Sequence, residues 1–372
     1  MRLYAILIAF MLGLALTACA TKPTVGLGVI ANVADATTER VFLATMRAPS
    51  PDKQTMFGAD RSDHLHFADF NISVPKNRAD GSLEFPTAKP DLKKQFAVTA
   101  ATLTDDEAII TSRLRTALAA MPPEKRSIFI FIHGYNVSFA EGLFEQAQLR
   151  HDFDVPGISL HFSWPSAAKT ALYLYDRDSV EYSRDGLMKT LRIAAAAKPK
   201  SIVVLAHSMG TLLTMETLRS LSLQGDTALV GMIDPLVLAA PDIDTDVFRT
   251  QLVSLTTRPK SIIVLVSEED KALRISGELR GGKSRVGAGA NKDELVAQGL
   301  IVLDLASVRA KGDGLSHSTF ANSPAFIAMV RSQNLRKGQR QKGGDLIAQT
   351  LGVGGDLLSS IVYLPAKLAG AR

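Results

Sequence analysis

From about residue 128 onward, short runs of apolar residues alternate along the chain with longer segments that carry apolar residues at helical spacing. Runs that are apolar at nearly every position predict strands buried on both faces. Strands that alternate with helices favour right-handed crossovers and a mostly parallel sheet with helices on both faces. The predicted fold class is therefore α/β, with strands at 128–132, 158–162, 202–206, 236–240, 262–266 and 300–305 and helices that include 105–121, 182–197 and 212–223.

The region before residue 105 has a different pattern. Segments 40–45 and 65–74 are rich in β-branched and aromatic residues, and the second partly alternates between apolar and polar positions. Pro75, Asn77, Gly81 and Pro86 then indicate loops. We expect these strands to form an antiparallel N-terminal edge of the sheet, within a domain of residues 39–330.

The first residues resemble a bacterial lipoprotein signal. A basic start and an apolar run over 3–16 are typical of a signal peptide and too short for a comfortable membrane span. Leu16-Thr17-Ala18-Cys19 then resembles a lipobox, in which the cysteine is lipidated after cleavage. We expect residues 1–18 to be the signal peptide and 19–38 a tether; the alternative is a plain signal peptide with a chance cysteine. By resemblance to Gram-negative lipoproteins, Ala20 favours the outer membrane, facing the periplasm.

The chain has 372 residues, a net charge of +5 and a single cysteine, which excludes a disulfide within the chain. Much of the positive charge lies in the tail 331–372, which begins with a basic segment and continues with an apolar, glycine-containing one. We expect a solvated linker and a docked helix there; the alternative is contact with anionic lipid. No basic stripe with interleaved aromatics is present, so nucleic acid is not an expected partner.

The strongest chemical motif is Ala206-His207-Ser208-Met209-Gly210, between the predicted strand 202–206 and a helix beginning near Thr211. Strand, sharp turn and helix are the context of a nucleophile elbow, which requires small residues two positions before and after the serine. The helix N-terminus supplies N–H groups for an oxyanion. Ser208 is the predicted nucleophile.

An His-Gly segment, His133-Gly134-Tyr135-Asn136, ends the strand 128–132. A segment of this kind can lend a backbone N–H to an oxyanion hole, so we assign the hole to the N–H groups of Tyr135 and Met209. For His133 we favour a structural role over base catalysis.

A serine nucleophile needs an imidazole to take its proton, and His317 follows the last predicted strand. Two carboxylates compete to orient that imidazole. Asp270 follows strand 262–266 and Asp242 follows strand 236–240. Both fit the order serine, acid, histidine; we prefer Asp270, which follows the next-to-last strand, and keep Asp242 as the alternative.

These residues all follow the carboxyl ends of predicted parallel strands, where open α/β sheets bind ligands. Gly134, Trp164 and His207 are candidates for substrate binding, although Trp164 could equally be a packing residue. The glycine-containing basic segment 277–289 is predicted to border the entrance. No metal-spaced cluster of His, Cys and Asp is visible, so no metal or organic cofactor is expected.

The motifs together resemble the α/β-hydrolase family of unknown function DUF900. The resemblance rests on His-Gly-Tyr-Asn at 133–136, Ser-Trp-Pro-Ser at 163–166, the helix start around Tyr175, Asp178 and Ser179, and Ala-His-Ser-Met-Gly at 206–210. It extends from about Arg40 to Phe320, with Thr211 where the family has Asn. It implies a hydrolase fold with a serine-aspartate-histidine site, and no particular substrate.

The resulting hypothesis is a serine hydrolase that cleaves an ester, thioester or similar acyl substrate at the cell envelope. A non-catalytic envelope scaffold that retains the fold is the alternative from another class, because fold does not fix function. Transfer of the acyl group to an acceptor other than water is a further alternative. The oligomeric state is not predicted.

Overall fold

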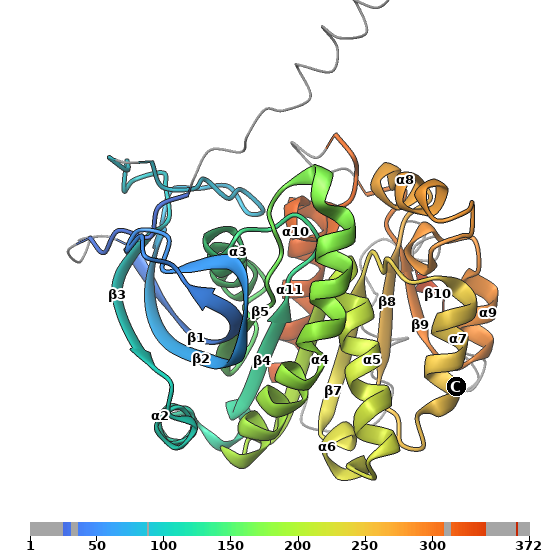
Figure 1. The fold of residues 1–372 in the computed structure, drawn as a ribbon, viewed down its shortest axis with the longest axis horizontal. Helices are drawn as coiled ribbons and strands as arrows, with labels where there is room; N and C mark the ends of the chain where they lie inside the picture. Colours follow the sequence, from blue (N-terminus) through green and yellow to red (C-terminus); the bar gives the residue numbers. More distant parts are fainter. Residues whose placement is uncertain (1–24, 31–35, 88, 309–313, 340–361, 364–372) are drawn as a thin grey trace, which may run out of the picture.

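The computed structural model describes residues 25–30, 36–87, 89–308, 314–339 and 362–363. One sheet of ten strands dominates them, in the order β10-β9-β8-β7-β6-β4-β5-β1-β2-β3. Figure 1 shows this sheet with helices along it. The strands are β1 (Ala36–Pro49), β2 (Phe57–Pro75), β3 (Ala97–Thr104), β4 (Ser127–Ile132), β5 (Ile158–Ser163), β6 (Ser201–His207), β7 (Ile233–Ala239), β8 (Ile262–Val266), β9 (Ile301–Asp304) and β10 (Val362–Tyr363).

The run β9-β8-β7-β6-β4-β5-β1 is parallel throughout. β1 pairs antiparallel with β2, and β2 antiparallel with β3, so the N-terminal edge is antiparallel as expected. Two details differ from the sequence prediction. β1 joins the main sheet in parallel, and β3 was not predicted because six of its eight residues are alanine or threonine with weak periodicity.

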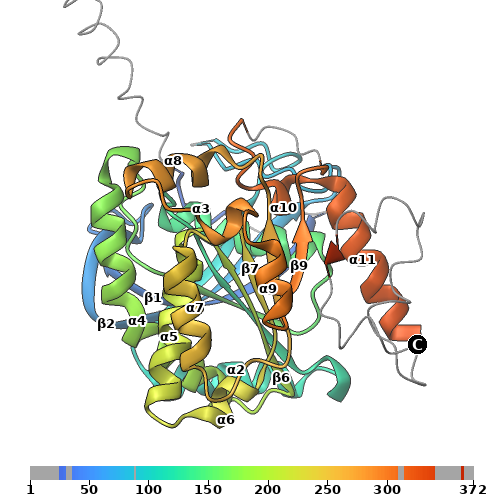
Figure 2. The ribbon, with the colours of Figure 1, turned by 90° about the vertical axis from the view of Figure 1, so that its right-hand side faces the viewer.

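Helices connect the parallel strands, and Figure 2 shows them on the two sides of the sheet. Helix boundaries were harder to predict than the strands: α4 begins nine residues before the predicted position 182, and α3 had no predicted counterpart. The helices are α2 (Glu107–Ala119), α3 (Phe139–Asp152), α4 (Tyr173–Ala196), α5 (Met209–Leu223), α6 (Thr227–Gly231), α7 (Thr245–Ser254), α8 (Lys271–Leu279), α9 (Lys292–Ala297), α10 (Thr319–Asn322) and α11 (Pro324–Gln339), with short 3₁₀ turns η1 (Pro123–Lys125), η2 (Thr170–Leu172) and η3 (Val286–Ala288).

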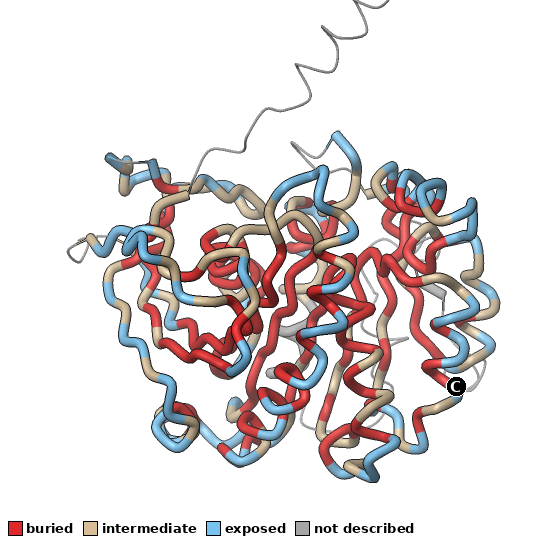
Figure 3. The backbone as a smooth tube through the Cα atoms, viewed as in Figure 1, coloured by how far each residue is buried: buried red, intermediate tan, exposed pale blue. Residues whose placement is uncertain are grey.

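The central strands are buried on both faces, as Figure 3 shows in red. All six residues of β4 and all six of β5 are buried. Burial on both faces explains why these strands appear in the sequence as continuous apolar runs rather than alternating ones. In Figure 1 the parallel strands from β4 to β9 end toward the upper edge, so the loops that follow them meet there.

The predicted linker after residue 330 is helical at its start, because α11 continues to Gln339. Arg331, the first basic residue of that tail, donates to the Asp152 backbone oxygen at 2.9 Å and pairs with Asp80 at 3.2 Å. It is therefore part of the folded domain. Cys19, the signal peptide, most of the tether and most of the remaining tail lie outside the described residues. Among the residues that are described, no helix is long and apolar enough to cross a membrane.

Candidate active site

Ser208 forms the turn between β6 and α5. Its backbone has φ 52° and ψ −122°, a strained conformation for a side-chain-bearing residue, and strain of this kind concentrates at functional sites. Gly210 allows the turn, because a Cβ there would lie 2.4 Å from the His133 carbonyl oxygen. Ala206 is fully buried, so a small residue is also needed on the strand side. The local geometry is that of a nucleophile elbow.

The loop after β4 passes directly beside this turn. A Cβ on Gly134 would lie 2.9 Å from the Ser208 Cβ, so only glycine permits the approach. The backbone N–H groups of Tyr135 and Met209 donate to no acceptor in the part of the chain that the structure describes. Two free N–H groups near a hydroxyl fit the requirement of an oxyanion hole. The Tyr135 side chain points elsewhere and donates to the Thr170 carbonyl.

His317 and Asp270 form a direct pair. The Nδ1 of His317 lies 2.7 Å from the Oδ2 of Asp270. The other oxygen of Asp270 accepts the Leu273 N–H at 2.9 Å and so caps α8. Because that helix fixes the carboxylate, the carboxylate can fix the ring and its tautomer, leaving Nε2 for a second partner.

His207 connects this pair to the elbow. Its ring centroid lies 4.8 Å from that of His317, and its Nε2 lies 3.3 Å from the His317 carbonyl oxygen. Burial lowers the pKa of His207 to about 3, with a smaller contribution from His317, so the ring is neutral at ordinary pH. Since His207 immediately precedes Ser208, this contact places the predicted nucleophile and the predicted base at the same edge of the sheet. A small cavity lined by Ala240, Asp270, Ser316, His317 and Phe320 lies on that side.

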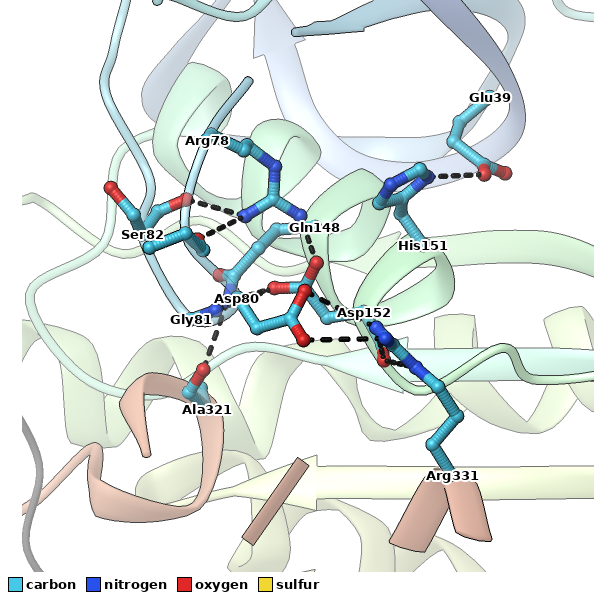
Figure 4. A network of polar contacts seen from close by, with 11 residues as sticks. Glu39, Arg78, Asp80, Gly81, Ser82, Gln148, His151, Asp152, Ala321 and Arg331 are labelled. Carbon is cyan, nitrogen blue, oxygen red and sulfur yellow. Dashed lines mark hydrogen bonds and ion pairs between the residues drawn. The ribbon is translucent and has the colours of Figure 1, made fainter. Parts of the chain in front are cut away.

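Polar contacts hold α10, the helix that begins two residues after His317 (Figure 4). Gln148 on α3 donates to the Ala321 carbonyl at 2.9 Å. Gln148 also donates to Asp152, whose carboxylate binds Arg78 and the Gly81 N–H. A Cβ on Gly81 would lie 2.8 Å from the Asn322 backbone. The loop around Gly81, α3 and α10 are thus connected to one another next to the segment that carries His317 in the sequence.

Asp242, the alternative acid, has other partners. It accepts from the Ser276 hydroxyl at 2.7 Å and from the Tyr173 hydroxyl at 3.1 Å, and lies 3.6 Å from the Nε of buried Arg285. The segment 285–287 reaches it because Val286 and Gly287 donate to the backbone of Ile243 and Pro241. Residues 285–287 of the basic segment 277–289 therefore lie at the same edge as Ser208.

Trp164 is fully buried and stacks on His133 with ring centroids 4.8 Å apart. Its Nε1 donates to the His133 carbonyl at 2.8 Å, while His133 Nε2 lies 3.1 Å from the Trp164 carbonyl. Such a side chain offers no surface to a ligand, so the structure favours the packing role. Burial also keeps the pKa of His133 well below its usual value, consistent with a structural histidine.

Sequence reasoning missed a buried network beneath these loops. Arg47 on β1 is 1% exposed and donates to Ser163, to the Ser166 and Val137 carbonyls and to Gly58. Asp176 on α4 accepts from Ser166 at 2.5 Å and from two backbone N–H groups. Burial lowers the pKa of Arg47 to about 10 and raises that of Asp176. The available signal was the Ser-Trp-Pro-Ser motif, whose two serines belong to this network.

A second cluster was also missed, far from Ser208 along the sheet. One ligand atom each from His64, His66 and Asp105 lie within 4.8 Å of one another. These residue types suit a divalent cation. His66 is, however, already bonded to Asp105 at 2.8 Å and to Ser62 at 3.0 Å, so the cluster is also complete as a hydrogen-bonded group.

Comparison with known proteins agrees with the fold. The family model described as "Alpha/beta hydrolase of unknown function (DUF900)" matches residues 107–334, more than half of the chain. The resemblance seen in the sequence begins at about Arg40 and ends at about Phe320, whereas the family model matches from residue 107 to residue 334. A comparison with curated proteins gives no match.

Similar solved structures are remote in sequence. Aspergillus fumigatus lipase B shares 13% identity at a TM-score of 0.38, and the match covers 68% of this chain and 62% of that one. Fungal esterases from Rhizomucor miehei share 13% identity at a TM-score of 0.35, and the match covers 82% of this chain and 83% of that one. Esterase B from Lactobacillus rhamnosis shares 11% identity at a TM-score of 0.36, and the match covers 90% of this chain and 95% of that one.

Proposed function

Because the chain belongs to the alpha/beta hydrolases of the DUF900 family, we propose that it is a serine hydrolase that cleaves an ester, thioester or similar acyl substrate. Ser208 attacks the carbonyl carbon, and His317 takes the hydroxyl proton and returns it to the leaving group. Asp270 orients His317, and the N–H groups of Tyr135 and Met209 hold the oxyanion.

The observation that carries this proposal is the bond of 2.7 Å between His317 Nδ1 and Asp270 Oδ2 at the edge where the strained Ser208 turn lies. An imidazole held by a carboxylate is the partner that a serine hydroxyl needs near neutral pH. A scaffold without activity has no requirement for this pair beside a strained serine. The chemistry needs no metal or organic cofactor.

Covalent labelling by a fluorophosphonate probe tests the proposal. We expect the full chain to be labelled and Ser208→Ala to remain unlabelled. Ser267→Ala is a matched control, because this serine follows β8 and lines the same cavity as Asp270 and His317 but is not the proposed nucleophile. Equal labelling of the full chain and Ser208→Ala, or labelling of neither, contradicts the proposal. Product analysis with and without added alcohols then separates hydrolysis from acyl transfer.

We further propose that the protein is a lipoprotein anchored through Cys19 in the outer membrane and facing the periplasm. The support is the lipobox-like segment 16–19, its position after an apolar run, and Ala20. Metabolic labelling with a palmitate analogue tests the anchor. The label should appear on the full chain and be lost in Cys19→Ala.

A further inference from the structure

Five large aliphatic side chains are exposed around the candidate active site. Isolated exposed leucines are normal, but a group of them at one place is characteristic of a docking surface. We call this group the apolar rim: Leu172 (40% exposed), Leu174 (77%), Ile275 (50%), Leu279 (69%) and Leu315 (48%).

Printed contacts link the three segments that carry the apolar rim. The start of α4 meets α8 where the Tyr173 hydroxyl lies 3.1 Å from that of Ser276. The start of α8 meets the segment before His317 where the Lys271 N–H donates to the Leu315 carbonyl at 3.0 Å. Asp270, which holds His317, is the residue that caps α8. Figure 1 places α8 and the upper end of α4 along the edge where the parallel strands end.

The N-terminal segment is fixed at this same edge. The Leu27 N–H donates to the Gln54 carbonyl at 2.8 Å, and Gln54 lies in the turn after the carboxyl end of β1. β1 runs parallel to β5, so its end shares the edge with the loops of the site. Cys19 precedes Leu27 by eight positions in the sequence. Eight extended residues span at most about 28 Å, so a lipid on Cys19 would keep this edge close to a bilayer.

We propose that the apolar rim inserts into the bilayer surface that carries the Cys19 lipid, and that the site acts on acyl esters of lipids presented there. The substrate class rests on the proposed function, and the tether argument on the proposed anchor. Lys271, Arg274 and Glu278 are also exposed on α8, so the charges are mixed. Insertion therefore depends mainly on the aliphatic groups, and a zwitterionic bilayer suffices.

Tryptophan fluorescence reports insertion directly, because the single native tryptophan, Trp164, is fully buried. We expect Leu279→Trp in the full chain to shift to the blue on phosphatidylcholine vesicles and to be quenched by brominated lipid. Val253→Trp is the control, since Val253 is 77% exposed on α7, outside the rim. No change at position 279, or equal changes at both positions, overturns the docking. A concentration-dependent shift at position 279 without vesicles also overturns it, because it identifies an interface between copies.

Activity tests the substrate class. The triple variant Leu174→Ser/Ile275→Ser/Leu279→Ser should lose about tenfold or more on a fluorescent phosphatidylcholine ester in vesicles. It should keep its rate on a water-soluble butyrate ester. Leu223→Ser/Val253→Ser, exposed outside the rim, should keep both rates. Equal loss on both esters overturns the lipid-surface proposal. Absence of both activities together with absence of fluorophosphonate labelling marks failure of the proposed function instead, and the fluorescence result still decides the docking.

Discussion

Two aspartates at the same edge of the sheet have nearly equal burial and different surroundings. Asp270 is 2% exposed after β8, and Asp242 is 3% exposed after β7. Asp270 faces the imidazole of His317 with one oxygen and a helix N–H with the other. Asp242 is held by two hydroxyl groups and a buried guanidinium. Position and burial do not separate the proposed catalytic acid from the other aspartate; the partner of each carboxylate does.

The largest expected effect is the loss of activity in Asp270→Asn. Asparagine still accepts the Leu273 N–H and caps α8, so the fold should persist. Its amide would face His317 Nδ1 and favour the wrong tautomer, which in triads of this type lowers kcat by about 10³- to 10⁴-fold. Steady-state kinetics on a soluble ester measures the loss, and circular dichroism checks the fold. A folded variant within tenfold of the parent would remove Asp270 from the proposed mechanism.

Asp242→Asn should lower the stability of the fold and leave kcat largely unchanged. The change leaves Arg285 as a buried cation without a counterion, which typically costs about 3–5 kcal/mol of stability. The folded fraction should retain kcat within about tenfold, because no proposed catalytic atom is lost. Urea unfolding gives the stability, and active-site titration with the fluorophosphonate probe normalises the rate. A loss of kcat as large as that of Asp270→Asn, at unchanged stability, would restore Asp242 as the candidate acid.

The pair with Arg285 offers a smaller and more specific test. Arg285→Met removes the cation while keeping apolar bulk, so it should relieve part of the cost of Asp242→Asn. A double-mutant cycle is expected to give a coupling free energy of about 1–3 kcal/mol. Urea unfolding of the two single variants and the double variant provides it. Strict additivity would show that the 3.6 Å approach contributes nothing to stability.

The difference between the two aspartates explains what the sequence could predict. The strands of the central sheet were predictable, because burial on both faces leaves continuous apolar runs. The residues that follow those strands were predictable as a group, because parallel strands end at one edge. Each of these residues directly follows its strand in the sequence, so the order of residues along the chain is enough to predict where it lies.

Contacts between distant segments were not predictable in the same way. Nothing in the sequence pairs Arg47 with Ser166, or His64 with Asp105, because each pair joins elements far apart in the chain. The same limit applied to Trp164, whose burial depends on a stacking partner in another loop. The partner of Asp242 was hidden for this reason too, since Arg285 lies in a glycine-containing segment with no regular periodicity.

Protonation of buried histidines gives the smallest expected effect on stability. It also distinguishes the surroundings of Ser208 from those of Asp242. Whereas Asp242 forms an ion pair, the strands and loops around Ser208 contain three buried histidines. Burial lowers the pKa of His161 and of His207 to about 3, and that of His133 well below its usual value. The unfolded chain binds these protons near pH 6.5, so stability is complete above that pH and is lost as pH falls toward 3. His161 and His207 should each cost about 1.4 kcal/mol at pH 5.5.

His161 isolates one of these protons, because no side chain among the described residues bonds to either of its ring nitrogens and it has no proposed catalytic role. We expect His161→Leu to fold and to reduce the slope of stability against pH between 6.5 and 3 by about one proton. Urea unfolding at half-unit pH steps measures both curves. Parallel curves would mean that His161 takes up its proton in the native state as readily as in the unfolded chain. The lowered pKa of His161 on β5 would then be wrong.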